Sequence, residues 1–128
     1  MDGMQDFTKL RVWHAAHAFA VETERVCGRA ARGRAALILQ LRRASASIAA
    51  NIAEGAGQPS PAQFARFLGI AIGSANEVTN HLLLARDTRA LPHAECEELI
   101  SRCNSTRRQL IALHKHLAPR PSTDPSAT

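Results

Sequence analysis

The stretch Leu39–Ala85, LQLRRASASIAANIAEGAGQPSPAQFARFLGIAIGSANEVTNHLLLA, decides the fold of this 128-residue chain. Apolar residues recur at spacings of three and four on both sides of a central break, GAGQPSP at 55–61, and this spacing is typical of amphipathic helices. In the break, Ser60 is a good helix N-cap, and Pro61 suits the first helical position because no N–H is needed there. The stretch therefore predicts two long helices joined as a hairpin.

The two apolar stripes give the bounds of these helices. The first stripe predicts a helix over 35–56 and consists of Leu37, Leu41, Ala44, Ile48 and Ile52. The second predicts a helix over 61–89 and consists of Phe64, Leu68, Ala71, Ala75, Val78, Leu82 and Ala85. The second stripe keeps a heptad spacing for about three repeats, which indicates a seam packed against other helices.

The same period predicts one further helix on each side of the hairpin, over 7–29 and 92–117. Gly33 is a good stop after the first of these. Short connections make neighbouring helices antiparallel, so we expect an all-α, up-down-up-down four-helix bundle over residues 1–117. The remaining residues, 118–128, have the Pro- and Ser-rich composition of a disordered tail.

Composition excludes several other classes of protein. Hydrophobic residues make up 45% of the chain but aromatic residues only 4%, which suits closely packed helices better than a β-sandwich or barrel. No apolar run reaches the roughly 20 residues that cross a membrane, and the N-terminus does not resemble a secretory signal, so we expect a cytoplasmic protein. Three cysteines without metal spacing, Cys27, Cys96 and Cys103, indicate reduced thiols.

Four polar residues of the 35–56 helix share one face because they are spaced four, four and three apart: Arg43, Ser47, Asn51 and Glu54. A turn centred on residues 58 and 59 predicts an ion pair from Arg43 to Glu77, and a cluster of Asn51 and Glu54 with Arg66. We interpret these residues as a structural polar network that fixes helix register and subunit packing. A ligand or nucleic-acid site is the alternative. Catalysis comes last, because no second carboxylate or histidine is expected near Glu54.

Two glycines lie inside the 61–89 helix, where each costs about 1 kcal/mol relative to alanine. Gly69 and Gly73 are four residues apart and share a face. We therefore expect close packing of another helix there, within the chain or from a second chain.

The sequence contains no pattern that indicates an enzyme. No Glu-x-x-His pair is present among the six histidines, and neither phosphate-loop fingerprint occurs. We expect no catalytic residue, no metal, no cofactor and no small-molecule substrate.

The net charge is +5, and its distribution matters more than its size. Around the first loop, arginines are matched by acidic residues. The 92–117 helix has no acidic residue after Glu98, and its basic residues are Arg102, Arg107, Arg108 and Lys115. These four form a candidate surface for RNA or DNA. Scarce aromatic residues argue against base stacking, so phosphate contacts would dominate.

The sequence also resembles a known family, the four-helix-bundle proteins encoded by intervening sequences in 23S ribosomal RNA genes. The motifs that carry the resemblance are Val12-Trp13, Gln40–Ala44, Ser47–Gly55 and Phe67–Glu77. Ala49 departs from a frequent proline of the family. The resemblance implies a cytosolic, ring-like homopentamer without known catalytic activity. A related group, the accessory variability proteins of diversity-generating retroelements, is basic and binds nucleic acid and a reverse transcriptase.

Two functions follow as hypotheses. The first is a non-enzymatic, self-assembling bundle that binds nucleic acid weakly through a basic surface. The alternative is a protein–protein scaffold without nucleic-acid binding, in which the charge serves only solvation.

Overall fold

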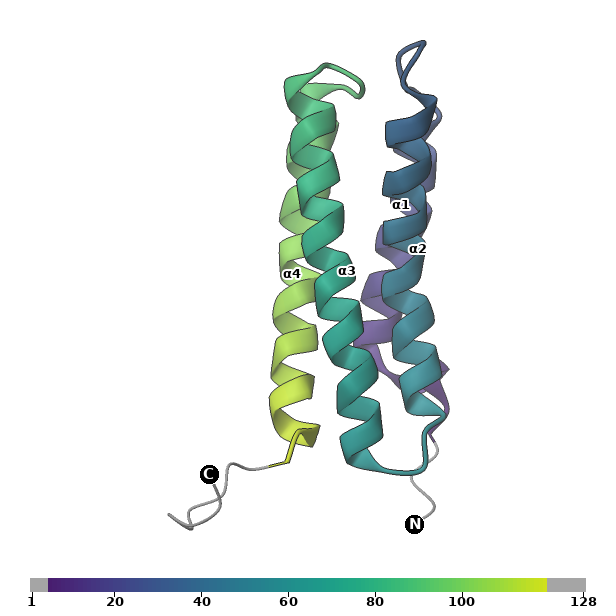
Figure 1. The fold of residues 1–128 in the computed structure, drawn as a ribbon, viewed down its shortest axis with the longest axis vertical. Coiled ribbons are helices and arrows are strands. Elements are labelled where there is room, and N and C mark those ends of the chain that lie inside the picture. The colour runs from purple at the N-terminus through teal and green to yellow at the C-terminus, as the bar shows by residue number, and fades with distance from the viewer. Residues whose placement is uncertain (1–4, 120–128) are drawn as a thin grey trace.

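The computed structural model describes residues 5–119, which form four long helices and one short 3-10 turn, without a strand (Figure 1). The elements are η1 (Phe7–Lys9), α1 (Arg11–Cys27), α2 (Ala35–Ala56), α3 (Pro61–Asp87) and α4 (His93–Leu117). From residue 120 onward, the predicted disordered tail lies outside the described residues.

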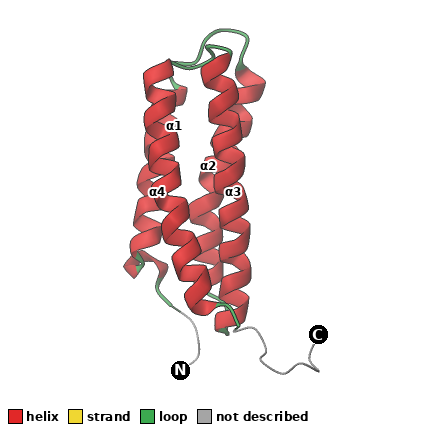
Figure 2. Cartoon of the chain, turned by 90° about the vertical axis from the view of Figure 1, so that its left-hand side faces the viewer, coloured by secondary structure: helices red, strands yellow, loops and turns green. Residues whose placement is uncertain are grey.

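The helices form a bundle in which each packs against two neighbours, in the cyclic order α1, α2, α3, α4. The α1–α2 and α3–α4 connections lie at one end and the α2–α3 connection lies at the other (Figures 1 and 2). Consecutive helices therefore run in opposite directions. The predicted all-α, antiparallel four-helix bundle is confirmed.

The break between α2 and α3 forms as its residues dictate. The Ser60 hydroxyl accepts a hydrogen bond from the Gln63 backbone N–H at 3.2 Å, and Pro61 is the first helical residue. At the other end of α3, the chain leaves the helix at Asp87, two residues before the predicted end. Arg89 adopts a left-handed backbone with φ of 59°, and the Ala90 N–H then bonds back to the Ala85 carbonyl.

The predicted first helix, 7–29, is wrong at both ends. Its first residues form η1, because the Asp6 carboxylate accepts hydrogen bonds from both the backbone N–H and the hydroxyl of Thr8. This local bonding competes with a regular helix, and Leu10 is extended before α1 begins. At the other end, α1 stops at Cys27 and Gly28 is its C-cap.

The core lies along the axis of the bundle. Its large members are fully buried: Phe19, Leu41, Ile48, Ile52, Leu68, Leu82, Leu99 and Leu110. Buried alanines such as Ala71 and Ala75 alternate with them along α3 and let the helices approach closely. The buried hydroxyl of Thr23 donates to the Phe19 carbonyl at 2.8 Å, so this polar group is satisfied inside the core.

The closest approach between α2 and α3 occurs at Gly55. A Cβ placed there would lie 2.8 Å from both Phe64 Cδ1 and Phe67 Cβ. The predicted bounds of this helix, 35–56, are those of α2, but sequence reasoning gave Gly55 no packing role. The glycine is needed because α3 occupies the space of a side chain.

Candidate functional site

Two serines connect the faces of α2 and α3 that carry the polar motif. The hydroxyl oxygens of Ser47 and Ser74 are hydrogen-bonded at 2.6 Å. The Asn51 side-chain amide donates to the Ser47 carbonyl, one turn back along α2, at 2.8 Å. Because the helices are antiparallel, the serine pair places Arg43 within one residue of the height of Glu77, and Glu54 level with Phe67. This register differs by about one helical turn from the one predicted.

The expected ion pairs do not form within the chain. Among residues 5–119, no ion pair joins Arg43 to Glu77, and neither Asn51 nor Glu54 bonds to Arg66; Glu77 lies 3.9 Å from His81 instead. The physical reason is direction, since the side chains of Arg43, Glu54, Arg66 and Glu77 are exposed on the outside of the helix pair. These four residues form a charged outer face, while the bonded part of the polar motif comprises Ser47, Asn51 and Ser74.

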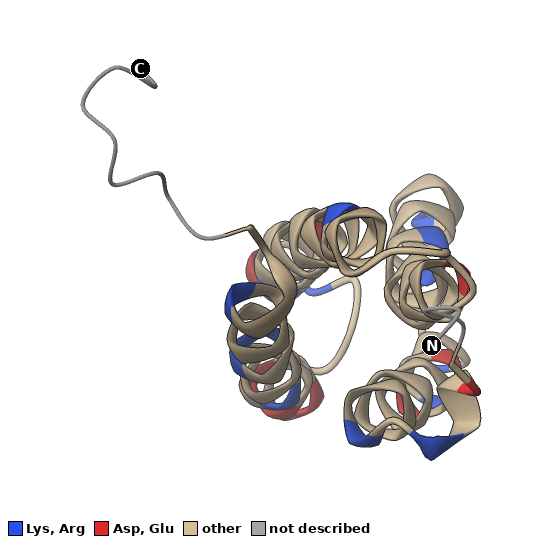
Figure 3. Cartoon of the chain, turned by 90° about the horizontal axis from the view of Figure 1, so that it is seen from below, with Lys and Arg blue, Asp and Glu red and all other residues tan. Residues whose placement is uncertain are grey.

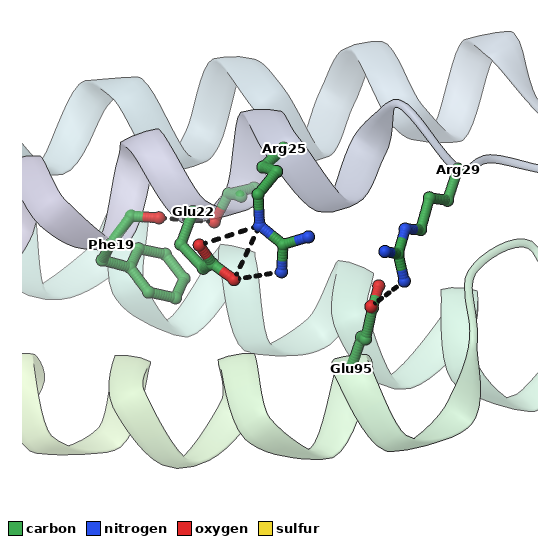
Figure 4. A network of polar contacts seen from close by, with 6 residues as sticks. Phe19, Glu22, Arg25, Arg29 and Glu95 are labelled. Atoms are coloured by element: carbon green, nitrogen blue, oxygen red, sulfur yellow. Dashed lines mark hydrogen bonds and ion pairs between the residues drawn. The ribbon is translucent and has the colours of Figure 1, made fainter.

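Near the α1–α2 and α3–α4 connections, oppositely charged side chains form ion pairs. Glu22 pairs with Arg25, and Arg29 of the first loop pairs with Glu95 of α4 (Figure 4). Hydrogen bonds from Arg25 lower the pKa of the Glu22 carboxyl. The other pairs at this end are Arg42 with Glu24, and Arg86 with both Asp87 and Glu97. Four arginines of this end are therefore paired with acids, whereas Arg32, Arg34 and Arg89 form no ion pair with the described residues.

The four basic residues of α4 that were predicted as a surface for RNA or DNA do not share one face of the helix. Arg102 faces α1, where it lines a shallow hollow with Phe19, and its charge also lowers the pKa of Glu22. Arg108 and Lys115 are exposed and lie about 20° apart around the helix, whereas Arg102 and Arg108 are about 120° apart. The structure thus separates Arg102 from Arg107, Arg108 and Lys115.

Arg107 belongs to the side of α4 that faces α3. Its side chain is half-buried and donates to the Asn104 side-chain oxygen at 3.4 Å. Two turns further, His114 lies beside Gly69 of α3, with its Nε2 4.0 Å from the position of an added Cβ. Arg107 and His114 therefore lie where α4 meets α3, and the exposed residues Arg108 and Lys115 lie next to them on the outer side of α4. We call these four residues and Gly69 the basic groove.

No helix of the same chain packs closely against the two glycines of α3. The prediction of close helix packing is therefore wrong for packing within the chain. A Cβ at Gly73 would have no atom within 4 Å, and Gly69 has only the His114 contact. Both glycines are exposed. They leave two open stretches on the surface of α3.

Charge is unbalanced at the end of the bundle that holds the α2–α3 connection. Its carboxylates among the described residues are Asp6 and Glu54, and its cations are Lys9, Arg11, Arg66, Arg107, Arg108 and Lys115. Viewed from this end, Lys and Arg follow the helix that leads into the C-terminal trace (Figure 3). The described residues give none of these six cations an ion pair with a carboxylate.

Comparison with known proteins agrees with the motifs and the fold. The family model described as 23S rRNA-intervening sequence protein matches residues 8–112, which include α1, α2, α3 and most of α4. The chain belongs to the 23S rRNA-intervening sequence protein family. The resemblance found in the sequence motifs is thereby confirmed. A search of curated proteins finds no match to the chain.

The thiols of this 23S rRNA-intervening sequence protein are buried in its core. Burial raises the pKa of Cys27 to about 11, and raises the pKa values of Cys96 and Cys103 as well. At neutral pH they are thiols rather than thiolates, so they are weak nucleophiles and weak metal ligands.

Residues 5–119 bring no three His, Cys, Asp or Glu side chains together as a metal site. No helix in the described part of the chain is long and apolar enough to span a bilayer.

Sequence reasoning missed an exposed apolar set on α2 and α3. Leu39, Ile70 and Leu84 are 47%, 46% and 49% exposed. The sequence did contain a signal, because all three are out of phase with the buried stripes of their helices. Apolar residues in that position indicate a second contact surface.

Proposed function

We propose that this protein is a non-enzymatic, self-assembling helical bundle of the cytoplasm that binds RNA or DNA weakly through the basic groove. The observation that carries the proposal is the partition of charge. At one end of the bundle acids and bases are nearly equal in number and four arginines are paired with acids, whereas at the other end six cations face two carboxylates and none has a carboxylate partner among the described residues. Three reduced, buried cysteines are consistent with a reducing compartment.

Phosphate is the chemistry that fits the basic groove. Arg108 and Lys115 project from the same face of α4, and Arg107 and His114 border the groove beside them. Gly69 leaves the α3 backbone open there, which lets a sugar–phosphate chain approach closely. The described chain has a single tryptophan, Trp13, and it already stacks on His17 with ring centroids 4.8 Å apart. Binding should therefore depend on charge and tolerate many sequences.

Self-assembly supports such weak binding through avidity. The family resemblance implies a ring-like homopentamer, in which the groove would occur once per copy. Several weak phosphate contacts then act together on one nucleic-acid strand, because binding of the second site is effectively intramolecular. The observation within this chain that favours assembly is the exposed apolar set on α2 and α3.

A salt titration tests the nucleic-acid part. We expect binding of duplex DNA and of a ribosomal RNA fragment at about 50 mM salt, with a log–log slope of about −0.9 per phosphate contact for the duplex and about −0.7 for single strands. The variant Arg107→Ala/Arg108→Ala/Lys115→Ala should assemble normally and lose most of this binding. The matched control, Arg25→Ala/Arg29→Ala/Arg42→Ala, removes the same charge from residues that are already paired with acids, and should retain more binding.

Two results would overturn the nucleic-acid part. One is no binding by the unchanged protein at concentrations well above about ten micromolar, the weak range of non-specific affinity. The other is equal loss in the groove variant and the control. Light scattering in the same buffer tests assembly separately. An assembled protein that binds no nucleic acid would favour the alternative function, a protein–protein scaffold.

A further inference from the structure

Both helices of the central hairpin carry a second stripe of residues on the outer face of the bundle. On α2 the spacing is four, three, four and four, and the stripe is Leu39, Arg43, Ala46, Ala50 and Glu54. On α3 the spacing is four, three, four and seven, and the stripe is Arg66, Ile70, Gly73, Glu77 and Leu84. All ten residues are exposed. This is the spacing of a helix–helix seam, yet no helix of the chain covers it.

The residues along the two stripes are ordered in a complementary way. From the end with the α1–α2 connection, the α2 stripe runs apolar, positive, small, small, negative. In the same direction, the α3 stripe runs apolar, negative, small, apolar, positive. The described chain offers none of the three residues Arg43, Glu54 and Arg66 an ion-pair partner. Their charges remain available to another molecule.

The register of the hairpin places these residues at similar heights. The Ser47–Ser74 hydrogen bond sets Arg43 within one residue of the height of Glu77. By the same bond, Glu54 and Arg66 lie within about one residue of the same height. Counted from the same bond, Leu39 is level with Leu82, and Leu84 lies about two residues, roughly 3 Å, nearer the α1–α2 connection. A second copy standing beside the first, parallel and without a shift along the axis, therefore brings the oppositely charged residues within about one residue of each other in height, and the two leucines within about two.

We propose that adjacent copies of this chain associate by packing α2 of one copy against α3 of the next, with parallel bundle axes and no axial shift. The inference rests on the self-assembly in the proposed function and names its surface. It places Arg43 against Glu77 of the neighbouring copy, Glu54 against Arg66, and Leu39 against Leu84. Ala46, Ala50 and Gly73 lie between these contacts, where their small size lets two helices approach.

The opposite orientation fits less well. An antiparallel copy that packs α2 on α2 would also pair Arg43 with Glu54, but it would place Leu39 against Gln58 and leave that apolar side chain without an apolar partner. The parallel arrangement satisfies both the charges and the apolar residues. A repeat without axial shift closes into a ring when its rotation per copy divides a full turn, whereas a shifted one grows into a filament. The contact therefore predicts a closed assembly, in which the exposed α4 residues of the basic groove, Arg108 and Lys115, are not part of the contact.

Charge reversal with rescue tests this contact. One variant reverses α2, Arg43→Glu/Glu54→Arg, and another reverses α3, Arg66→Glu/Glu77→Arg. Each keeps the net charge and places like charges opposite each other, so the concentration for half-assembly should rise by about tenfold or more. The quadruple variant restores opposite charges everywhere and should regain the mass of the unchanged protein. Arg32→Glu/Glu98→Arg, exposed and outside both stripes, is the matched control and should not change the mass.

The readouts are sedimentation velocity for mass and circular dichroism for helix content. If a reversal variant lost its helices, Gly73→Leu would replace it, since its side chain meets open space in the single chain but would block the neighbour. Reversal of α2 alone without loss of assembly would favour the α2-on-α2 contact and overturn the inference, as would a quadruple variant that stays dissociated. A monomeric unchanged protein would overturn both the inference and the assembly part of the proposed function.

Discussion

The substitution Gly55→Ala should destabilise the bundle, although alanine is the better helix former. The intrinsic preference favours alanine by about 0.5–1 kcal/mol inside a helix. The structure opposes it, because the new Cβ would lie 2.8 Å from Phe64 Cδ1 and Phe67 Cβ. That is about 1 Å closer than a normal carbon–carbon contact of about 3.5–4.0 Å. The Phe67 Cβ is fixed to the α3 backbone and cannot rotate away, so α3 must shift.

Overpacking of this kind costs about 1–3 kcal/mol, so we expect a net loss in the free energy of unfolding of about 1–2 kcal/mol. Urea denaturation followed by circular dichroism measures it. Gly69→Ala is the matched control, since its Cβ would make an ordinary contact, 4.0 Å from His114 Nε2, and it should stabilise by about 0.5–1 kcal/mol. Equal stabilisation by the two substitutions would refute the close approach at Gly55.

Two further predictions concern titrating groups. The pKa values of Glu22 and Asp87 are lowered from 4.5 and 3.8 by Arg25 and Arg86, so their contribution to stability is present above these values and is lost as pH falls through the lowered ones. Thermal melts should show falling stability below about pH 4.5, and Arg25→Gln should weaken this dependence; a pH-independent melt would contradict it. Because burial raises the pKa of Cys27 to about 11 and the other two thiols are also buried, iodoacetamide at pH 8 should label the folded protein only as fast as it opens. Rapid labelling of one thiol, measured by mass spectrometry, would show that it is accessible.

The fold could be predicted from sequence because the spacing of apolar residues indicates which face of each helix is buried. Leu68, Ala71, Ala75 and Val78 are fully buried, as their stripe predicts. The break at Ser60 and Pro61 was readable for a similar reason, since capping depends on residues close in sequence. The ends of α1 were less readable, because the Asp6 cap and the Gly28 C-cap compete with a helix that the periodicity alone would extend.

The charged contacts could not be predicted in the same way. Two residues at one height on adjacent helices meet only if their side chains converge, and those of Arg43 and Glu77 both point outward. Glycine is ambiguous for a related reason. Gly55 and Gly73 are both helical, yet one faces Phe67 and the other faces open space. The position of Arg102, by contrast, was available from the sequence, because the rotation per residue already separates it from Arg108.

An even number of antiparallel helices brings the start of α1 and the end of α4 to the same end of the bundle (Figure 1). That end also holds six cations against two carboxylates, whereas at the far end acids and bases are nearly equal in number and several of them form ion pairs. Parallel copies would add these differences together, so the whole particle would have a direction, with one charged rim and one neutral rim. Nucleic acid would then approach from one side. A purification tag on either terminus would emerge on that side and compete with it, while a tag inserted at Gly33, in the exposed first loop, would leave it free.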